Sequence, residues 1–348
     1  MSRKYLSSML SIVLLDEDSP LECYYNRICT IGKCMGLNFD SSNLIKRTIS
    51  HLISNYMIII VLYFVGAVGY SLLFVDSMPH VAVSITIFII YLQAVISMIF
   101  LIQWVKQGNI HKFINLLKEP QNGEGVNRYR KSLLLQMMAA FSMTILVLLY
   151  ISSTFAVYFS GKNVTAIDRE IINSFGNRDS YIIPLIAQEY ALFAWNLSIL
   201  IYVFCVEVTF YEIRYFNRSI RTMNGITEES LCAQISTAIM KYSDIALAIR
   251  SLDKIFKRYP FMMIACTIPS LLFCLYVVFS RLNSDKEEKV LMIPALLYLL
   301  YSFFSLTAVP AKLHDEITKT KSAFYENTHL VPLSIISVQC SRCILFSS

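Results

Sequence analysis

The chain has 348 residues, of which 56% are apolar and only 16% are charged, and its mean hydropathy is +0.56. This composition excludes an ordinary soluble globular protein and is typical of a chain that lies largely within a lipid bilayer. The formal net charge is modest, at +6.

The chain contains six long stretches without Asp, Glu, Lys or Arg, at residues 48–75, 77–105, 132–161, 190–206, 259–280 and 290–311. A helix of about 20 residues crosses the roughly 30 Å hydrocarbon core of a bilayer. The fourth stretch is shorter, but Glu189 and Glu207 at its ends can lie in the headgroup layers. The sequence therefore predicts an all-α polytopic transmembrane helix bundle with six clear spans.

The segments between and around these spans complete the predicted organisation. We expect a cytosolic N-terminal segment at 1–47, the six-span bundle at 48–311, and a cytosolic helix followed by an atypical tail at 312–348. The cytosolic loop 207–258 has apolar residues at helical spacing, which predicts a hairpin of two helices with a turn near Asn224.

The orientation follows from the distribution of basic residues. With the N-terminus in the cytosol, 24 of the 30 Lys and Arg lie in cytosolic segments and 6 in outer loops. The positive-inside rule strongly favours this orientation. The positive net charge is thus explained by membrane topology, and we predict no nucleic-acid partner. None of the nine cysteines lies in an outer loop, which argues against a G-protein-coupled receptor with its usual outer disulfide.

The predicted spans lack the clusters that catalysis requires. They contain no paired carboxylates, no Ser-His-Asp set and no group of metal ligands, so we predict neither an enzyme nor a metal or cofactor site. His314, Asp315 and Glu316 are interpreted as a solvated helix face below the sixth span. A six-span small-solute transporter remains the alternative, and it would require broken helices or buried ionisable groups at the midplane.

Hydroxyl, amide and aromatic side chains gather in the outer halves of the spans. An apolar and aromatic cavity with a few polar groups suits a small ligand, although Tyr and Trp also collect at membrane interfaces. The candidate ligand-binding residues are Tyr158, Glu189, Trp195, Asn196, Tyr276 and Tyr298. Asn163, in an outer-loop Asn-x-Thr triplet, is the candidate glycosylation site.

The layout of the chain resembles the insect gustatory receptor family. Residues 210–220 (FYEIRYFNRSI) are similar to the pattern beneath that family's fourth span, and 249–260 resemble its approach to the fifth. Residues 311–321 (AKLHDEITKTK) look like the segment after its sixth span. The resemblance implies a ligand-gated, non-selective cation channel in the plasma membrane, a tetramer with other subunits, and a small tastant. A related odorant receptor is the nearest neighbouring interpretation.

The resemblance also implies a seventh, pore-lining span, and the tail departs from that pattern. After Glu326 only 15 residues precede Arg342, and they include Pro332 and several polar residues. Placing Arg342 near the centre of a span costs about 2.5–3.5 kcal/mol. The sequence therefore predicts an incomplete seventh span and a form that does not conduct ions.

The predicted orientation can be tested with an epitope tag at residue 1. Because the basic residues place the N-terminus in the cytosol, we expect antibody staining only after the cells are permeabilised. Staining of intact cells would contradict the orientation.

Overall fold

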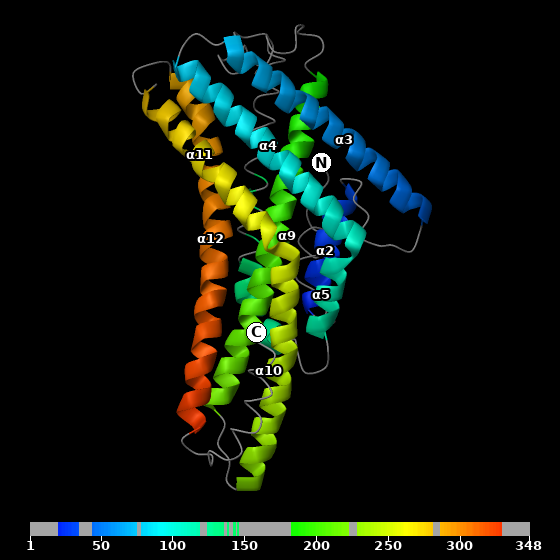
Figure 1. Cartoon of the computed structure of the whole chain (residues 1–348), viewed down its shortest axis with the longest axis vertical. Coiled ribbons are helices and arrows are strands. Elements are labelled where there is room, and N and C mark those ends of the chain that lie inside the picture. The colour runs from blue at the N-terminus through cyan, green and yellow to red at the C-terminus, as the bar shows by residue number, and fades with distance from the viewer. Residues whose placement is uncertain are drawn as a thin grey trace, which may run out of the picture.

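The computed structural model describes residues 20–34, 44–74, 78–118, 124–135, 138, 142–143, 145, 182–222, 228–280 and 286–328 (Figure 1). The described part of the chain is helical and contains no strand, which confirms the all-α prediction. Its elements are α2 (Pro20–Cys34), α3 (Leu44–Ser71), the short 3-10 helix η1 (Leu72–Phe74), α4 (Met78–Gln107), α5 (Asn109–Lys118), α6 (Glu124–Arg128), α9 (Ile182–Arg221), α10 (Glu228–Phe256), α11 (Arg258–Ser280) and α12 (Lys286–Thr328).

Five of these helices are long and apolar enough to cross a membrane, namely α3, α4, α9, α11 and α12. They correspond to the predicted first, second, fourth, fifth and sixth spans. Most of the predicted third span, 132–161, lies outside the described residues, as does the tail beyond Thr328. The chain is a multi-pass membrane protein.

Helix α9 is the central element of the bundle (Figure 1). In its apolar window 94% of the residues are buried, compared with 22–44% in the other four spanning helices. It packs against α3, α4, α6, α10 and α12, whereas α4 and α11 form a second close pair. A helix covered on nearly every side must satisfy its polar side chains within the protein.

The long helices continue well below the predicted membrane boundary. Helix α9 runs on to Arg221 and α10 returns over Glu228–Phe256, so the predicted cytosolic hairpin has two helices. Helix α12 is one element from Lys286 to Thr328. The charge at Lys312 marks where the chain leaves the apolar layer, but a helix continues as long as its backbone hydrogen bonds do.

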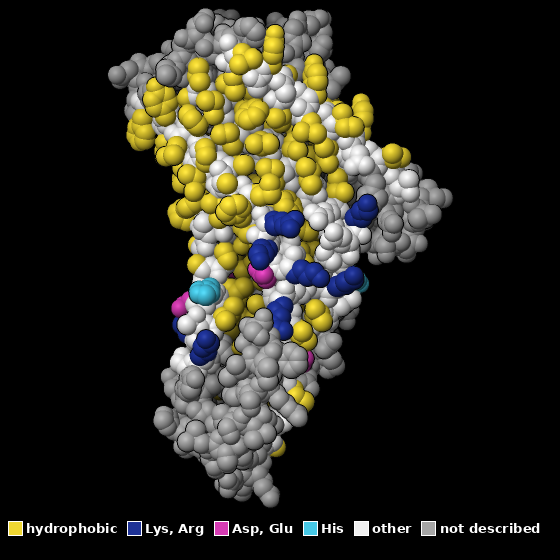
Figure 2. Space-filling model, in the orientation of Figure 1, with side chains coloured by type: hydrophobic (Ala, Val, Ile, Leu, Met, Phe, Trp, Pro, Cys, Tyr) yellow, Lys and Arg dark blue, Asp and Glu magenta, His cyan; other side chains and the backbone are white. Residues whose placement is uncertain are grey.

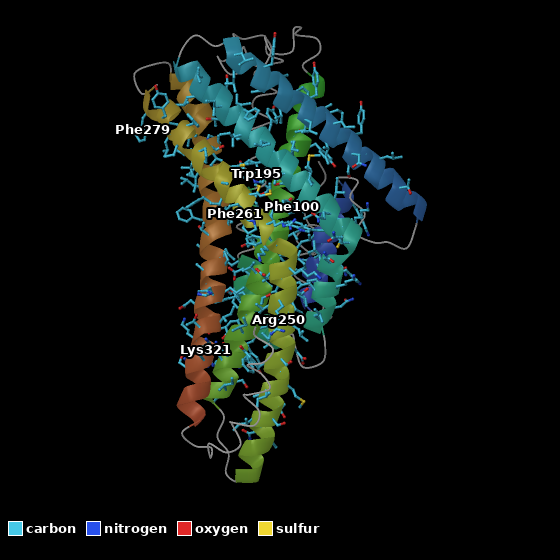
Figure 3. The ribbon with its side chains drawn as sticks, viewed as in Figure 1. Phe100, Trp195, Arg250, Phe261, Phe279 and Lys321 are labelled. Atoms are coloured by element: carbon cyan, nitrogen blue, oxygen red, sulfur yellow. The ribbon has the colours of Figure 1, made fainter. Side chains whose placement is uncertain are left out.

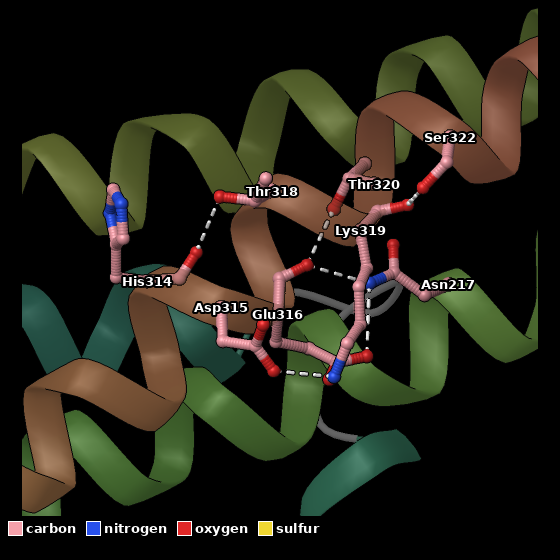
Figure 4. A network of polar contacts seen from close by, with 8 residues as sticks. All are labelled: Asn217, His314, Asp315, Glu316, Thr318, Lys319, Thr320 and Ser322. Carbon is pink, nitrogen blue, oxygen red and sulfur yellow. Dashed lines mark hydrogen bonds and ion pairs between the residues drawn. The ribbon is translucent and has the colours of Figure 1, made fainter.

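Below the membrane a polar contact joins α9 to α12 (Figure 4). The buried Asn217 amide donates to the backbone oxygen of Glu316 at 2.9 Å and to its carboxylate Oε1 at 3.1 Å. Lys319 also bonds to Asp315 and Glu316. The prediction of a solvated face therefore holds for His314 and Asp315, which are exposed, but is wrong for Glu316, which faces α9.

A second contact fixes α6 to the opposite side of α9. The Val126 backbone N–H donates to the buried Glu212 carboxylate at 2.9 Å. A carboxylate at the first turn of a helix pairs with an N–H that has no partner within the helix. The neighbouring Gly125 allows this approach, because a Cβ there would lie 2.5 Å from the backbone oxygen of Tyr211.

This junction gives a test with a matched control. Gly125→Ala should lower the thermal stability of the purified chain in detergent, since forcing an extra carbon into a packed contact costs roughly 1–3 kcal/mol. Gly66→Ala should leave stability unchanged or slightly raised, because a Cβ at Gly66 meets nothing within 4 Å and alanine favours the helix. Equal melting temperatures for the wild type and Gly125→Ala would contradict the packing.

Candidate ligand-binding site

The centre of the candidate site is an aromatic pair between α9 and α12. The Trp195 and Tyr298 rings meet edge to face, with centroids 4.8 Å apart and an interplanar angle of 85°. Both side chains are buried, at 0% and 5% exposure. Trp195 lies 6 residues into the predicted fourth span and Tyr298 lies 9 residues into the sixth, so both belong to the outer half of the membrane in the predicted orientation.

The polar atoms of this pair have no hydrogen-bond partner within the described structure. Neither the Trp195 indole Nε1 nor the Tyr298 hydroxyl makes a bond, and the buried Ser270 and Ser302 hydroxyls share this property. Leaving a buried donor without a partner costs about 1–3 kcal/mol. These groups are therefore the candidate contacts for a bound molecule.

The other tryptophan provides a useful contrast. Trp104, near the cytosolic end of α4, donates from Nε1 to the Ile255 backbone oxygen at 3.3 Å. It also packs edge to face against Phe256 and Tyr259, at centroid distances of 4.8 and 5.1 Å. Trp104 is therefore a satisfied core residue, whereas the indole N–H of Trp195 has no partner within the part of the chain that the structure describes. Figure 3 shows Trp195 in the upper part of the bundle, well above Arg250.

Beside the aromatic pair, buried polar side chains join α4, α9 and α11. Gln93 Nε2 donates to Thr267 Oγ1 at 2.9 Å, while its amide oxygen has no partner within the described structure. Ser198 Oγ donates to the Ser97 backbone oxygen at 3.2 Å. Interhelical hydrogen bonds of this kind fix helix pairs in a bilayer, where apolar contact alone does not distinguish a helix from lipid. These two hydrogen bonds hold α4 against α11 and α9 within the bundle.

Sequence reasoning missed Gln93, Ser97, Ser198 and Thr267. A signal existed in α4, because Gln93 and Ser97 stand four residues apart in a mostly apolar span and so share one helix face. The partners Thr267 and Ser198 carried no comparable signal. Their hydroxyls can bond to their own helix, and both also do so here.

The structure brings together only part of the predicted residue set. Asn196 is buried on α9, but as the neighbour of Trp195 it is rotated about 100° around the helix. Glu189 is partly exposed and lies six residues, or about 9 Å, above Trp195. Tyr276 is 48% exposed on α11, and the structure does not bring it into the group. Tyr158 and Asn163 lie outside the described residues.

Metal ligands do not cluster among the described residues, and the spans that contain interior prolines are continuous. No group of three or more His, Cys, Asp or Glu could hold a metal ion among the residues that the structure describes. Pro269 lies inside α11, and Pro294 and Pro310 lie inside α12, yet each helix continues through them. The broken helices that the transporter alternative requires are thus not found in these two spans.

Comparison with solved structures identifies the fold. The chain is similar to the insect olfactory receptor OR5 from Machilis hrabei, with a TM-score of 0.69 and 15% identity over 91% of this chain and 86% of that chain. It is also similar to the same receptor in complex with eugenol, with a TM-score of 0.57 and 14% identity over 85% and 81% of the two chains.

No protein-family model and no curated protein sequence matches this chain. Both structural matches are structures of an insect olfactory receptor. The chain therefore has the fold of an insect olfactory receptor, which confirms the multi-span chemoreceptor fold that the sequence resemblance implied.

Proposed function

We propose that this chain is a chemoreceptor of the insect ligand-gated cation-channel type, and that it binds a small neutral molecule between α9 and α12. The observation that carries the proposal is the buried pair of Trp195 and Tyr298, whose N–H and O–H lack partners within the described structure. The fold shared with an olfactory receptor supports the same function.

The chemistry of the site limits the ligand class. Its aromatic and hydroxyl groups would cover an apolar or aromatic body, and the indole N–H of Trp195 requires an oxygen acceptor on the ligand. Apart from Glu189 at the rim, the residues described for the site carry no formal charge. A neutral ligand fits, because burying an ion beside unpaired dipoles is costly. One matched structure contains eugenol, a first probe for this chain.

The finer assignment rests on the sequence. Residues 210–220 and 311–321 support the gustatory branch, and the resemblance supports a plasma-membrane tetramer with other subunits. Glu189, Asn196 and the outer part of the third span, including Tyr158, remain candidate contacts at the rim, and Asn163 remains the candidate glycosylation site.

The two tryptophans allow the ligand site to be tested directly, because the chain has no others. In the Trp104→Phe variant, Trp195 is the sole tryptophan, and a bound ligand should change its fluorescence emission. In Trp195→Phe the remaining indole reports from the cytosolic side and should not respond. Eugenol and then a panel of neutral sugars and bitter compounds are titrated into the purified chain. Equal responses from the two variants, or none with any compound, would contradict the site.

A single hydroxyl provides the quantitative test. Tyr298→Phe removes an O–H with no partner in the described structure and keeps the ring, so eugenol affinity should fall roughly fivefold, which corresponds to about 1 kcal/mol. Tyr242→Phe, on cytosolic α10 where the ring stacks on Phe216, is the matched control and should bind as the wild type does. An equal loss in both variants would indicate a general effect on the fold.

Conduction is tested separately. We expect cells expressing these 348 residues alone to show no ligand-gated current, because residues 330–348 form a poor pore-lining span with Arg342 inside it. Patch-clamp recording with and without the same panel measures this. A robust cation current would show that the tail does line a pore.

A further inference from the structure

Exposed basic residues occupy one face of the junction between α10 and α11. Lys254, Lys257 and Arg258 have i, i+3 and i+4 spacing and all three side chains are exposed. The helical hydrogen bonding continues across the junction, since the Lys257 N–H donates to the Asp253 backbone oxygen at 2.8 Å. The interruption at this point is explained by Pro260, whose ring crowds the carbonyl four residues earlier. The three cations therefore share one surface.

This basic face is continuous with a lipid-facing surface of α11. Phe261 follows one turn after Lys257 and is 76% exposed, and further exposed apolar side chains continue the same helical face towards the outer end at Ile268, Leu272 and Phe279. Figure 3 shows Phe261 and Phe279 on α11, with Arg250 on α10 well below them. The exposed surface of α11 thus changes from apolar side chains to basic side chains within about one helical turn.

The depth of the change matches the headgroup layer of a bilayer. At 1.5 Å per residue, Arg258 and Lys257 lie about 4.5 and 6 Å below Phe261, and Lys254 lies about 10.5 Å below it. The headgroup region on each side of the hydrocarbon core is roughly 5–8 Å thick. Long basic side chains can also extend towards the charged groups of lipids.

A neighbouring helix adds charge to the same level. The α4 terminus is held beside the junction by the hydrogen bond from Trp104 to Ile255, and the exposed Lys106 follows two residues later. Helix α5, which packs on α10, carries the exposed Lys112. Asp253 is the exposed acidic residue within the stretch 250–258. Figure 2 shows dark blue side chains gathered directly below the hydrophobic band.

We propose that this face, formed by Lys106, Lys254, Lys257 and Arg258, binds the headgroup of a polyphosphoinositide in the cytosolic leaflet. Several cations at headgroup depth match a lipid with several phosphate charges, whereas one basic residue would suffice for a lipid with a single net charge. The Lys ammonium and Arg guanidinium groups donate charge-assisted hydrogen bonds to phosphate oxygens. A lipid bound there would fix the α10–α11 junction against the membrane.

Binding is tested on the full chain in neutral detergent with a fluorescent short-chain phosphatidylinositol 4,5-bisphosphate. Lys257→Gln combined with Arg258→Gln should weaken binding roughly 30-fold, from the contribution of each basic residue near an anionic membrane surface. The matched control is Arg218→Gln with Lys321→Gln, which also removes one Arg and one Lys but at exposed positions further from the membrane. The control should bind as the wild type does.

Three other anionic ligands test whether the face recognises a polyphosphoinositide or any negatively charged molecule. Short-chain phosphatidylserine should bind at least tenfold more weakly than the bisphosphate, and free inositol trisphosphate and an acidic peptide should bind weakly. Equal affinity for any of them, or an equal loss in the two double variants, would overturn the proposal. If the first double variant does not fold, Lys106→Gln with Lys254→Gln provides the same test, and Lys257→Arg with Arg258→Lys should retain binding.

Discussion

Helix α9 is buried almost completely by its neighbours, and this burial organises the whole bundle. In a bilayer, lipid tails are as apolar as leucine, so contact between apolar surfaces gives a helix little reason to prefer one neighbour to another. Specific rings and hydrogen bonds must supply that preference. Helix α9 has them along its length, from Trp195 against Tyr298, through Ser198 against Ser97, to Glu212 against Val126 and Asn217 against Glu316.

These contacts divide the helix pair of α9 and α12 into two parts with different character. At the outer end the pair is aromatic, and two of its polar groups lack partners within the described structure. Below the membrane the Asn217 amide is bonded twice to Glu316. The separation of Trp195 and Asn217 is 22 residues, or about 33 Å along the helix. A ligand beside this aromatic contact would therefore bind at the end of the helix pair where polar groups lack partners, and the other end is held by the Asn217–Glu316 hydrogen bonds.

The second close pair, α4 with α11, has the reverse order of contacts: its polar contact lies within the span and its aromatic contacts lie near the cytosolic boundary. Its polar bond between Gln93 and Thr267 lies within the span, and its aromatic cluster around Trp104 lies near the cytosolic boundary. That cluster places the end of α4 beside the basic face of the α10–α11 junction. The packing around Trp104 therefore also brings Lys106 on α4 close to the basic residues of the α10–α11 junction, at the depth of the headgroup layer.

Features that depend on segment length and charge could be predicted from the order of residues alone. A span needs about 20 uncharged residues and basic loops stay inside, so the described spans, the cytosolic hairpin and the fold resemblance could be predicted from residue order. It could also point to Trp195 and Tyr298 as polar aromatic residues in the outer half. Arg342 likewise distinguished the tail from an ordinary span.

The side of each helix that faces protein became known only from the packing of the helices. In a soluble helix the apolar face is the buried face, but in a membrane both lipid and protein accept apolar side chains, so periodicity does not distinguish them. This is why Tyr276 could be grouped with Tyr298 from sequence although it is exposed on α11. Glu316 was assigned to solvent because a carboxylate beyond a span is normally solvated, and only the packing of α12 on α9 placed Asn217 against it. Gln93 likewise gained a meaning only when α11 placed Thr267 opposite its amide.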